Sequence, residues 1–165
     1  TRSLVVTGVQ TCALPIFSTA KGTRKSEVPL IRLVRDHGIE GDAHAGNWHR
    51  QISMLAEESV DTMRAVCSLP LTAGAFAENI NTEGIDLKAL PVGTHLRIGE
   101  AEVEVTQIGK RCHNDGCAIQ RAAGHCVMPT EGIFVIVIRE GIVRKGDPIE
   151  ILSGTAEAGN KDGAD

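Results

Sequence analysis

The ten residues from Leu96 to Val105, LRIGEAEVEV, constrain the fold of this chain more than any other stretch. Apolar and polar residues alternate on both sides of the dipeptide Gly99-Glu100. Because the glycine comes first, this dipeptide suits a two-residue type II′ turn between antiparallel strands. The turn sets Arg97 opposite Glu102. The predicted β-hairpin has a buried face made of Leu96, Ile98, Ala101, Val103 and Val105, and a wet face made of His95, Arg97, Glu102 and Glu104.

Short apolar segments separated by glycine and proline recur along the rest of the chain. We expect strands at 30–34, 52–55, 133–138, 142–143 and 149–152. The continuously apolar run 133–138 is typical of a strand buried on both faces. The one clear helix is expected at 57–66, with Val60, Met63 and Val66 on its buried stripe. Many short strands with glycine turns predict a mainly β fold, a β-barrel with one or more peripheral helices.

The composition excludes several classes of function. A net charge of -4 argues against non-specific binding of nucleic acid, and 2% aromatic residues without tyrosine argue against a base-stacking platform. The longest apolar run is too short for a membrane helix, and no secretory signal is recognisable. We therefore expect a cytoplasmic protein without nucleic-acid or membrane partners. We then expect its clustered cysteines to be nucleophiles or metal ligands rather than a disulfide framework.

Both ends of the sequence differ in character from its middle. Residues 1–16, TRSLVVTGVQTCALPI, resemble the translated read-through of a sequencing adapter. We expect a non-native leader there and leave Cys12 out of the candidate site. Residues 153–165 are small and polar, which predicts a disordered tail. A single domain is expected at 17–152.

The segment from Gln107 to Cys126, QIGKRCHNDGCAIQRAAGHC, concentrates the reactive groups of the chain. Strand-like sequence enters and leaves it, so we expect a loop mounted on the β scaffold. Cys112 directly follows Lys110 and Arg111. Neighbouring cations favour the thiolate, which is the form that attacks sulfur or binds a soft metal. The alternative interpretation is an inert buried cysteine.

The same loop also holds enough ligands for a metal site. They are Cys112, His113, Cys117, His125 and Cys126. These ligands suffice for a structural zinc site or an iron–sulfur cluster, although the spacing lacks the C-x2-C knuckles of common zinc modules. A redox pair, in which Cys117 or Cys126 resolves a sulfur species on Cys112, needs only two cysteines. The residues alone leave these alternatives open.

A second candidate stretch, 37–49, packs three glycines and three histidines into thirteen residues. This density suits backbone that turns close to a ligand. The candidate group around it comprises Asp42, His44, His49 and Arg50. The guanidinium of Arg50 offers a planar fork for phosphate or carboxylate, whereas loop histidines more often lie at the surface. By its chemistry, the pair Glu78-Asn79 is as suited to capping backbone as to binding a substrate.

With these stretches identified, the chain resembles the MOSC family, named for the C-terminal domain of molybdenum cofactor sulfurases, in its small stand-alone bacterial form. Four motifs in order carry the resemblance. They are GIEGDAHAGNWHRQISML from Gly38, GAFAENINTEGIDL from Gly74, LPVGTHLRIGEAEVEVTQIGKRC from Leu90, and MPTEGIFVIVI with GDPIEIL near the end. They cover most of residues 32–152. The resemblance implies a β-barrel of the pyruvate-kinase-like type, in agreement with the strand pattern.

The resemblance also implies a function. In this family, a cysteine after the long hairpin carries persulfide sulfur or ligates the molybdenum of the pterin cofactor, and the matching position is Cys112. The residues implied around it are Asp42, His44, Glu78, Asn79, the anion contact Arg50, and the cations Lys110 and Arg111. We therefore expect a protein that binds molybdenum cofactor or carries sulfur. Whether it is an enzyme, either a sulfur transferase or a reductase of N-hydroxylated compounds, stays open.

Partners follow from the same resemblance. They are a cysteine desulfurase or an electron donor, together with proteins of molybdenum cofactor biosynthesis or molybdoenzymes, while pyridoxal phosphate is not expected in this chain. The alternative is a binding module with zinc or an iron–sulfur cluster at 112–126. The chain departs from the family pattern at Ala77, usually Gly, and at Arg111, usually Pro. Cys117 and Cys126 are additions that imply a thiol relay or a metal clip.

Overall fold

Strands dominate the molecule. The computed structural model describes residues 3–4, 12–17, 26–43, 45–72, 74–109, 118–124 and 126–152. In sheet order, the main sheet consists of β1 (Ser3–Leu4), β12 (Ile149–Leu152), β8 (His95–Ile98), β9 (Ala101–Ile108), β10 (Ile133–Arg139), β6 (Ile52–Ala56), β7 (Ile80–Glu83), β2 (Cys12–Phe17) and β3 (Ser26–Glu27). A smaller sheet consists of β11 (Gly141–Arg144), β4 (Leu30–Val34) and β5 (Gly38–Ile39). The mainly β fold is confirmed.

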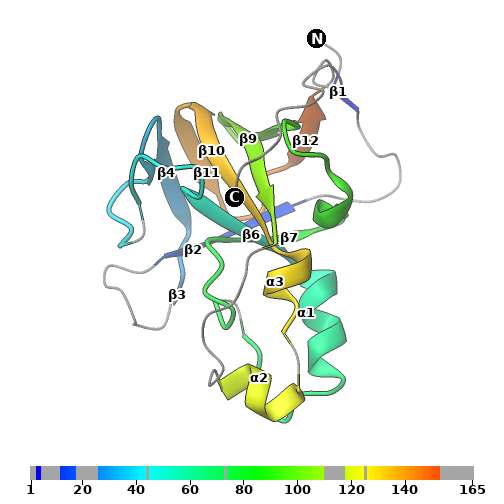
Figure 1. Ribbon diagram of the computed structural model, residues 1–165. Helices are drawn as coiled ribbons and strands as arrows, with labels where there is room; N and C mark the ends of the chain where they lie inside the picture. The colour runs from blue at the N-terminus through cyan, green and yellow to red at the C-terminus, as the bar shows by residue number, and fades with distance from the viewer. Residues whose placement is uncertain are drawn as a thin grey trace.

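The main sheet curls into a nearly closed barrel of seven strands, from β12 to β2 (Figure 1). Closure occurs where β2 meets the turn that precedes β12. The amide of Ala13 donates to the carbonyl of Asp147 at 3.0 Å, and the amide of Gly146 donates to the carbonyl of Ala13 at 2.8 Å. The smaller sheet packs beside this seam, since β4 and β11 both contact β2. The predicted β-barrel is therefore present.

The central hairpin forms as the sequence predicts. Strands β8 and β9 pair with Arg97 opposite Glu102 and Leu96 opposite Val103. Gly99 has φ of 55°, the left-handed value that a type II′ turn requires at its first position. The apolar face is buried, and on the other face the ring nitrogens of His95 lie 2.7 and 3.0 Å from carboxylate oxygens of the hairpin. Local pattern and turn chemistry are sufficient to set this register.

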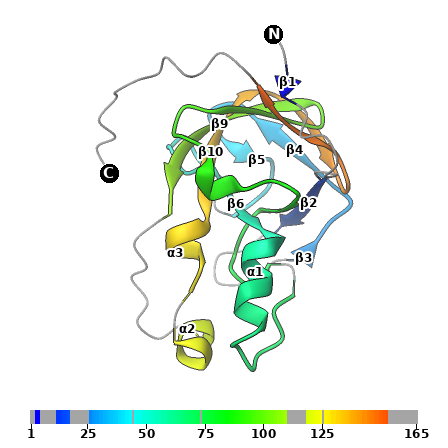
Figure 2. The ribbon, with the colours of Figure 1, turned by 90° about the vertical axis from the view of Figure 1, so that its right-hand side faces the viewer.

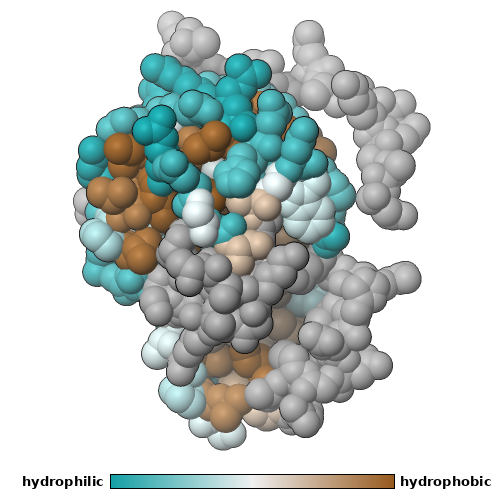
Figure 3. All heavy atoms as spheres, turned by 90° about the vertical axis from the view of Figure 1, so that its left-hand side faces the viewer, coloured by the Kyte–Doolittle hydropathy of each residue, from teal (hydrophilic) through white to brown (hydrophobic). Residues whose placement is uncertain are grey.

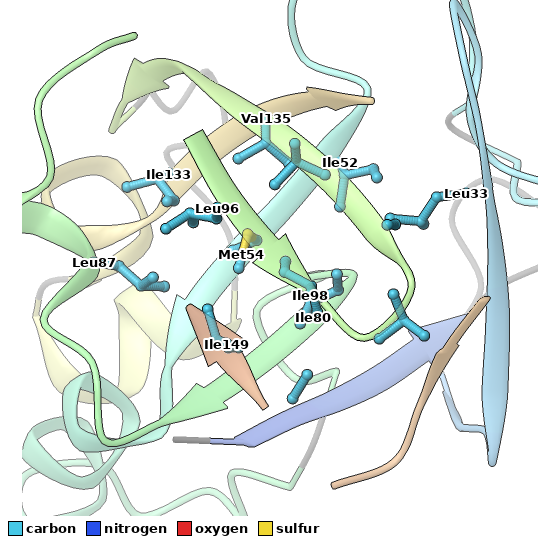
Figure 4. Packing of buried hydrophobic residues seen from close by; sticks show 14 of the residues in the cluster. Leu33, Ile52, Met54, Ile80, Leu87, Leu96, Ile98, Ile133, Val135 and Ile149 are labelled. Carbon is cyan, nitrogen blue, oxygen red and sulfur yellow. The ribbon is translucent and has the colours of Figure 1, made fainter. Parts of the chain in front are cut away.

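The barrel interior is filled by aliphatic side chains from every side of the sheet (Figure 4). Strand β10 contributes Ile133 and Val135 to this core and turns Phe134 to the other face. Phe134 belongs to a second cluster with Leu55, Val60, Met63, Leu71, Phe76, Val127 and Met128. The expectation of a strand buried on both faces is correct for Ile133–Val135.

The second cluster lies beneath one end of the barrel, where the helices gather (Figure 2). They are α1 (Glu57–Arg64), α2 (Ala118–Ala123) and α3 (Met128–Glu131), and the 3-10 helix η1 spans Leu87–Ala89. No helix in the described part of the chain is long and apolar enough to cross a membrane. Polar residues cover the upper part of the face in Figure 3, and apolar ones gather at its left side and lower part.

The prediction that Val66 belongs to the core is wrong. Val66 was expected on the buried stripe of the helix, but α1 ends at Arg64 and Val66 is 54% exposed. The helix stops early because the guanidinium of Arg64 turns back to the carbonyl of Leu71, and the chain folds away from the helix axis. The prediction that 1–16 is a leader concerns the origin of the sequence and stays a prediction. Within that range the structure has β1 and most of β2.

Candidate functional site

Four residues from four neighbouring strand positions form a row on the outer face of the barrel. They are Gln107, Phe134, Ser53 and Asn79, here called the outer row. Phe134 pairs with Gln107 on one side and with Ser53 on the other, and the amide of Asn79 donates to the carbonyl of Ser53 at 2.9 Å. The strand neighbours of Phe134, Ser53 and Asn79 belong to the barrel core, so alternation turns these three residues away from it; the neighbours are Ile133, Val135, Ile52, Met54 and Ile80. A register shift in the pairing of β9 with β10 sets Gln107 beside Phe134.

Asn79 is fixed in the row by Ser53. Its side-chain Oδ1 accepts hydrogen bonds from the Ser53 amide at 2.9 Å and from the Ser53 hydroxyl at 3.0 Å. The residue is only 3% exposed, and its Nδ2 has no acceptor among the residues that the structure describes. A buried amide donor without an acceptor is costly, which marks this atom as a binding candidate.

Glu78 is placed by a tight turn that precedes Asn79. One of its carboxylate oxygens accepts the amide of Gly74 at 2.6 Å, and the residue is 1% exposed. Ala77, between them in the turn, has φ of 61° in the left-handed region. That oxygen of Glu78 therefore caps backbone, as its chemistry allows, and the turn delivers Asn79 to the start of β7.

Arg50 reaches the outer row from the loop 40–50, which follows β5. Its Cζ lies 4.7 Å from the ring centroid of Trp48 and 5.7 Å from that of Phe134. Within the described chain its guanidinium makes no ion pair or hydrogen bond, and its Nε is buried. An arginine held by rings alone keeps its donor fork for an anion.

The same loop is tied to strand β9. The hydroxyl of Thr106 donates to the carbonyl of His49, and the His49 ring Nε2 lies 2.9 Å from Oε1 of Gln107. Trp48 and His49 meet edge to face, with ring centroids 6.0 Å apart. The loop 40–50 is thus held at the point where β9 ends.

The exit of β9 is crowded enough to require glycine. Gly109 has φ of 69°, and its amide donates to the carbonyl of Gly132 at 2.6 Å. A Cβ atom on Gly109 would lie 2.1 Å from the carbonyl oxygen of Pro129. Gly109 stands three residues before Cys112, so this contact fixes the backbone at the last described position before that cysteine.

The structure describes only part of the predicted site. His44, Lys110, Arg111, Cys112, His113, Cys117 and His125 lie outside the described residues. Asn79 belongs to the outer row and Arg50 lies against it, Asp42 is buried in the loop 40–50, and Cys126 is half-buried against the second cluster. Within the described ranges no group of three His, Cys, Asp or Glu is placed to hold a metal ion.

Several residues at the site were missed from the sequence. They are Trp48, Ser53, Thr106, Gln107 and Phe134. Ser53 did carry a signal, because it is the only polar residue within the apolar run ISMLA. The others depend on which strands lie side by side, which alternation along one strand does not reveal.

Among the cysteines that the structure describes, Cys12 has a suppressed thiolate form. Burial, and then the neighbouring Glu83 carboxylate, raise the pKa of the Cys12 thiol, whose Sγ lies 3.8 Å from Glu83 Oε2. A raised pKa lowers the thiolate fraction at neutral pH, so Cys12 is a poor nucleophile there. Cys67 is half-buried against the second cluster. Neither cysteine belongs to the outer row.

Comparison with known proteins gives one family. A sequence model described as the MOSC domain matches residues 41–150. The uncharacterized protein YflK of Bacillus subtilis (strain 168) is 27% identical over 143 residues, which cover 81% of this chain and 62% of YflK. The chain thus spans about three-fifths of the length of this curated relative.

Two crystal structures show the same fold. The YUAD protein from Bacillus subtilis superposes with a TM-score of 0.70 at 21% identity, over 86% of this chain and 95% of that protein. YiiM from Geobacillus stearothermophilus superposes with a TM-score of 0.65 at 18% identity, over 88% of this chain and 76% of that protein. At these identities the likeness concerns the fold alone.

Proposed function

Since this chain belongs to the MOSC domain family, we propose that it binds molybdenum cofactor or carries sulfur, with Cys112 as the residue that ligates molybdenum or holds the persulfide. The family is associated with molybdenum cofactor binding. A thiolate is a soft ligand and a strong nucleophile toward sulfur, so one cysteine suits either role. The observation that carries the proposal is Arg50, a cation without a carboxylate partner among the described residues, which lies beside the end of β9, the strand that precedes Cys112 in the sequence.

The described residues fit an anionic, oxygen-rich cofactor. Arg50 is a cation without a carboxylate partner in the described chain, and Asn79 offers a buried amide donor that lacks an acceptor there. Arg50 lies against Phe134, and Asn79 is bonded to Ser53, the strand neighbour of Phe134, so both belong to one side of the barrel. Such donors suit the phosphate and the polar ring edges of a pterin cofactor.

Each residue then has a defined task. Arg50 would hold an anionic group and Asn79 a polar edge. Ser53 keeps Asn79 in place, and the rings of Trp48 and Phe134 hold Arg50. The cofactor, when bound, supplies a molybdenum centre capable of redox chemistry. In the sulfur-carrier form, the Cys112 thiolate attacks the outer sulfur of a persulfide on a cysteine desulfurase. A new S–S bond forms on Cys112, and the donor cysteine leaves as a thiolate.

The decisive experiment is elemental analysis combined with intact-mass measurement on protein purified without oxygen. We expect either molybdenum at about one atom per chain or, after incubation with a desulfurase and cysteine, a mass gain of one or more sulfur atoms. Stoichiometric zinc or iron, with neither molybdenum nor persulfide, would contradict the proposal. That result would favour the structural metal site at 112–126 instead.

The variant Cys112→Ser tests the residue itself. We expect it to lose all bound molybdenum or persulfide sulfur while its circular dichroism and unfolding midpoint stay unchanged, because serine is a hard, weakly nucleophilic replacement. Cys67→Ser is the matched control, since Cys67 is half-buried and outside the site. Cys12 contributes little background near neutral pH because burial raises its pKa. Full loading of Cys112→Ser would remove this residue from the mechanism.

A further inference from the structure

The guanidinium of Arg50 is held in an unusual way. Most half-buried arginines pair with a carboxylate or donate to carbonyl oxygens. Arg50 does neither within the described residues. Its Cζ instead lies 4.7 Å from the ring centroid of Trp48 and 5.7 Å from that of Phe134. Aromatic faces attract a cation without occupying its N–H donors.

The rings of Phe134 and Trp48 differ in whether core packing explains their positions. Phe134 is buried in the second cluster, so packing alone explains its presence. Trp48 is 44% exposed, which is high for the largest side chain, so core packing does not explain its position. It stands beside His49, whose bonds to Thr106 and Gln107 secure this part of the loop on β9.

We propose that Trp48 is a positioning residue for Arg50, holding the guanidinium over its indole face so that the donor fork stays free for an oxyanion. The inference rests on the proposed function only in taking Arg50 as the anion contact of that site. Trp48 itself donates no charge to the ligand. It replaces the carboxylate that would otherwise orient the arginine, and that would also neutralise it and compete with an anionic ligand.

Inorganic phosphate is the probe, compared with sodium chloride at matched ionic strength. The ¹H–¹⁵N resonance of Arg50 Nε can be followed because this atom is buried, and it is assigned by its absence in Arg50→Gln. Trp48 gives an independent signal, since the chain has one tryptophan and no tyrosine. We expect saturable changes in both signals on adding phosphate. Both should be lost in Arg50→Gln.

The positioning role is then read from two substitutions at Trp48. Trp48→Leu should weaken phosphate binding roughly three- to ten-fold, which is the range expected for removing one partly exposed cation–π contact. Trp48→Phe should recover most of the affinity, because a ring face returns. Leu30→Ala is the matched control, as Leu30 is a similarly exposed apolar residue on β4, and it should bind like the wild type.

The outcomes separate this inference from the proposed function. Equal phosphate affinity in Trp48→Leu and wild type would overturn the positioning role, as would the absence of any saturable change in the wild type. Equal affinity in Trp48→Leu and Trp48→Phe, both below wild type, would also overturn it. Phosphate binding requires no cysteine, so failure of the Cys112 test would leave this result standing.

Discussion

At the residue scale, the turn that places Glu78 and Asn79 depends on the backbone conformation of Ala77, which is strained for a residue with a Cβ atom. Ala77 has φ of 61°, a region where the Cβ of an L-residue crowds the following carbonyl. The turn is nevertheless kept, because Ala77 donates to the carbonyl of Gly74 and Glu78 caps the same glycine. This is the position where the resemblance to the family led us to expect glycine.

Ala77→Gly should therefore stabilise the protein. We expect the free energy of unfolding to rise by about 0.5–1 kcal/mol, which is the relief of left-handed strain less the added freedom of the unfolded chain. Ala77 is exposed, so no packing is lost. Urea denaturation measures the change. The control is Ala75→Gly, because Ala75 has no positive φ and packs on the second cluster, so it should destabilise. Equal effects of the two variants would show that Ala77 is unstrained.

At the element scale, the central hairpin joins a second turn. The amide of Glu100 donates to the carbonyl of Ile142, and the carboxylate of Asp147 accepts the Arg144 amide at 2.8 Å. Arg144 also lies 2.8 Å from Glu100 and lowers the pKa of that exposed carboxyl. The hairpin turn is therefore fixed by contacts with β11 as well as by its own sequence.

Gly99 and Gly146 both have positive φ, but only Gly99 is crowded by other parts of the fold. Comparing alanine substitutions at the two positions therefore separates the strain of the turn itself from the clash with its surroundings. A Cβ on Gly99 would lie 2.3 Å from Asp147 Oδ2 and 3.0 Å from the carbonyl oxygen of Ile142, whereas one on Gly146 would meet nothing within 4 Å. We expect Gly146→Ala to destabilise by about 1 kcal/mol and Gly99→Ala by about 2–4 kcal/mol. Thermal and urea unfolding measure both. Equal losses would mean that Asp147 moves aside freely.

At the scale of the whole molecule, closure of the barrel depends on β2. This strand pairs with β7 and bonds to the turn at 146–147, and its Ile16 is fully buried. The amide of Ile16 donates to the carbonyl of Asn79 at 2.7 Å. The strand that closes the barrel is therefore bonded directly to the backbone of an outer-row residue.

Ile16→Ala tests whether β2 is a true core strand. Removing a fully buried isoleucine side chain should lower the free energy of unfolding by about 2–4 kcal/mol. Leu14→Ala, on the same strand but only half-buried, should cost less. Denaturant unfolding followed by circular dichroism measures both losses. No loss for Ile16→Ala would support the prediction that residues 1–16 are a non-native leader.

The sequence by itself determined what depends on neighbours along the chain. The register of the hairpin, the strands at 30–34 and 133–138 and the start of the helix at Glu57 all follow from alternation, turn glycines and first-turn charge. The end of that helix did not follow, because it depends on Arg64 reaching Leu71. Cys112 was singled out in the same way, from the residues beside it and its place after the hairpin.

Only the tertiary structure decided how the site is assembled. Ser53, Asn79, Gln107 and Phe134 become neighbours because β7, β6, β10 and β9 lie side by side in that order. The placement of the Arg50 guanidinium likewise depends on Phe134, which is far away in the sequence. The physical reason is that alternation tells which face of a strand a residue occupies. Which strand lies beside it is set by packing and closure of the whole barrel.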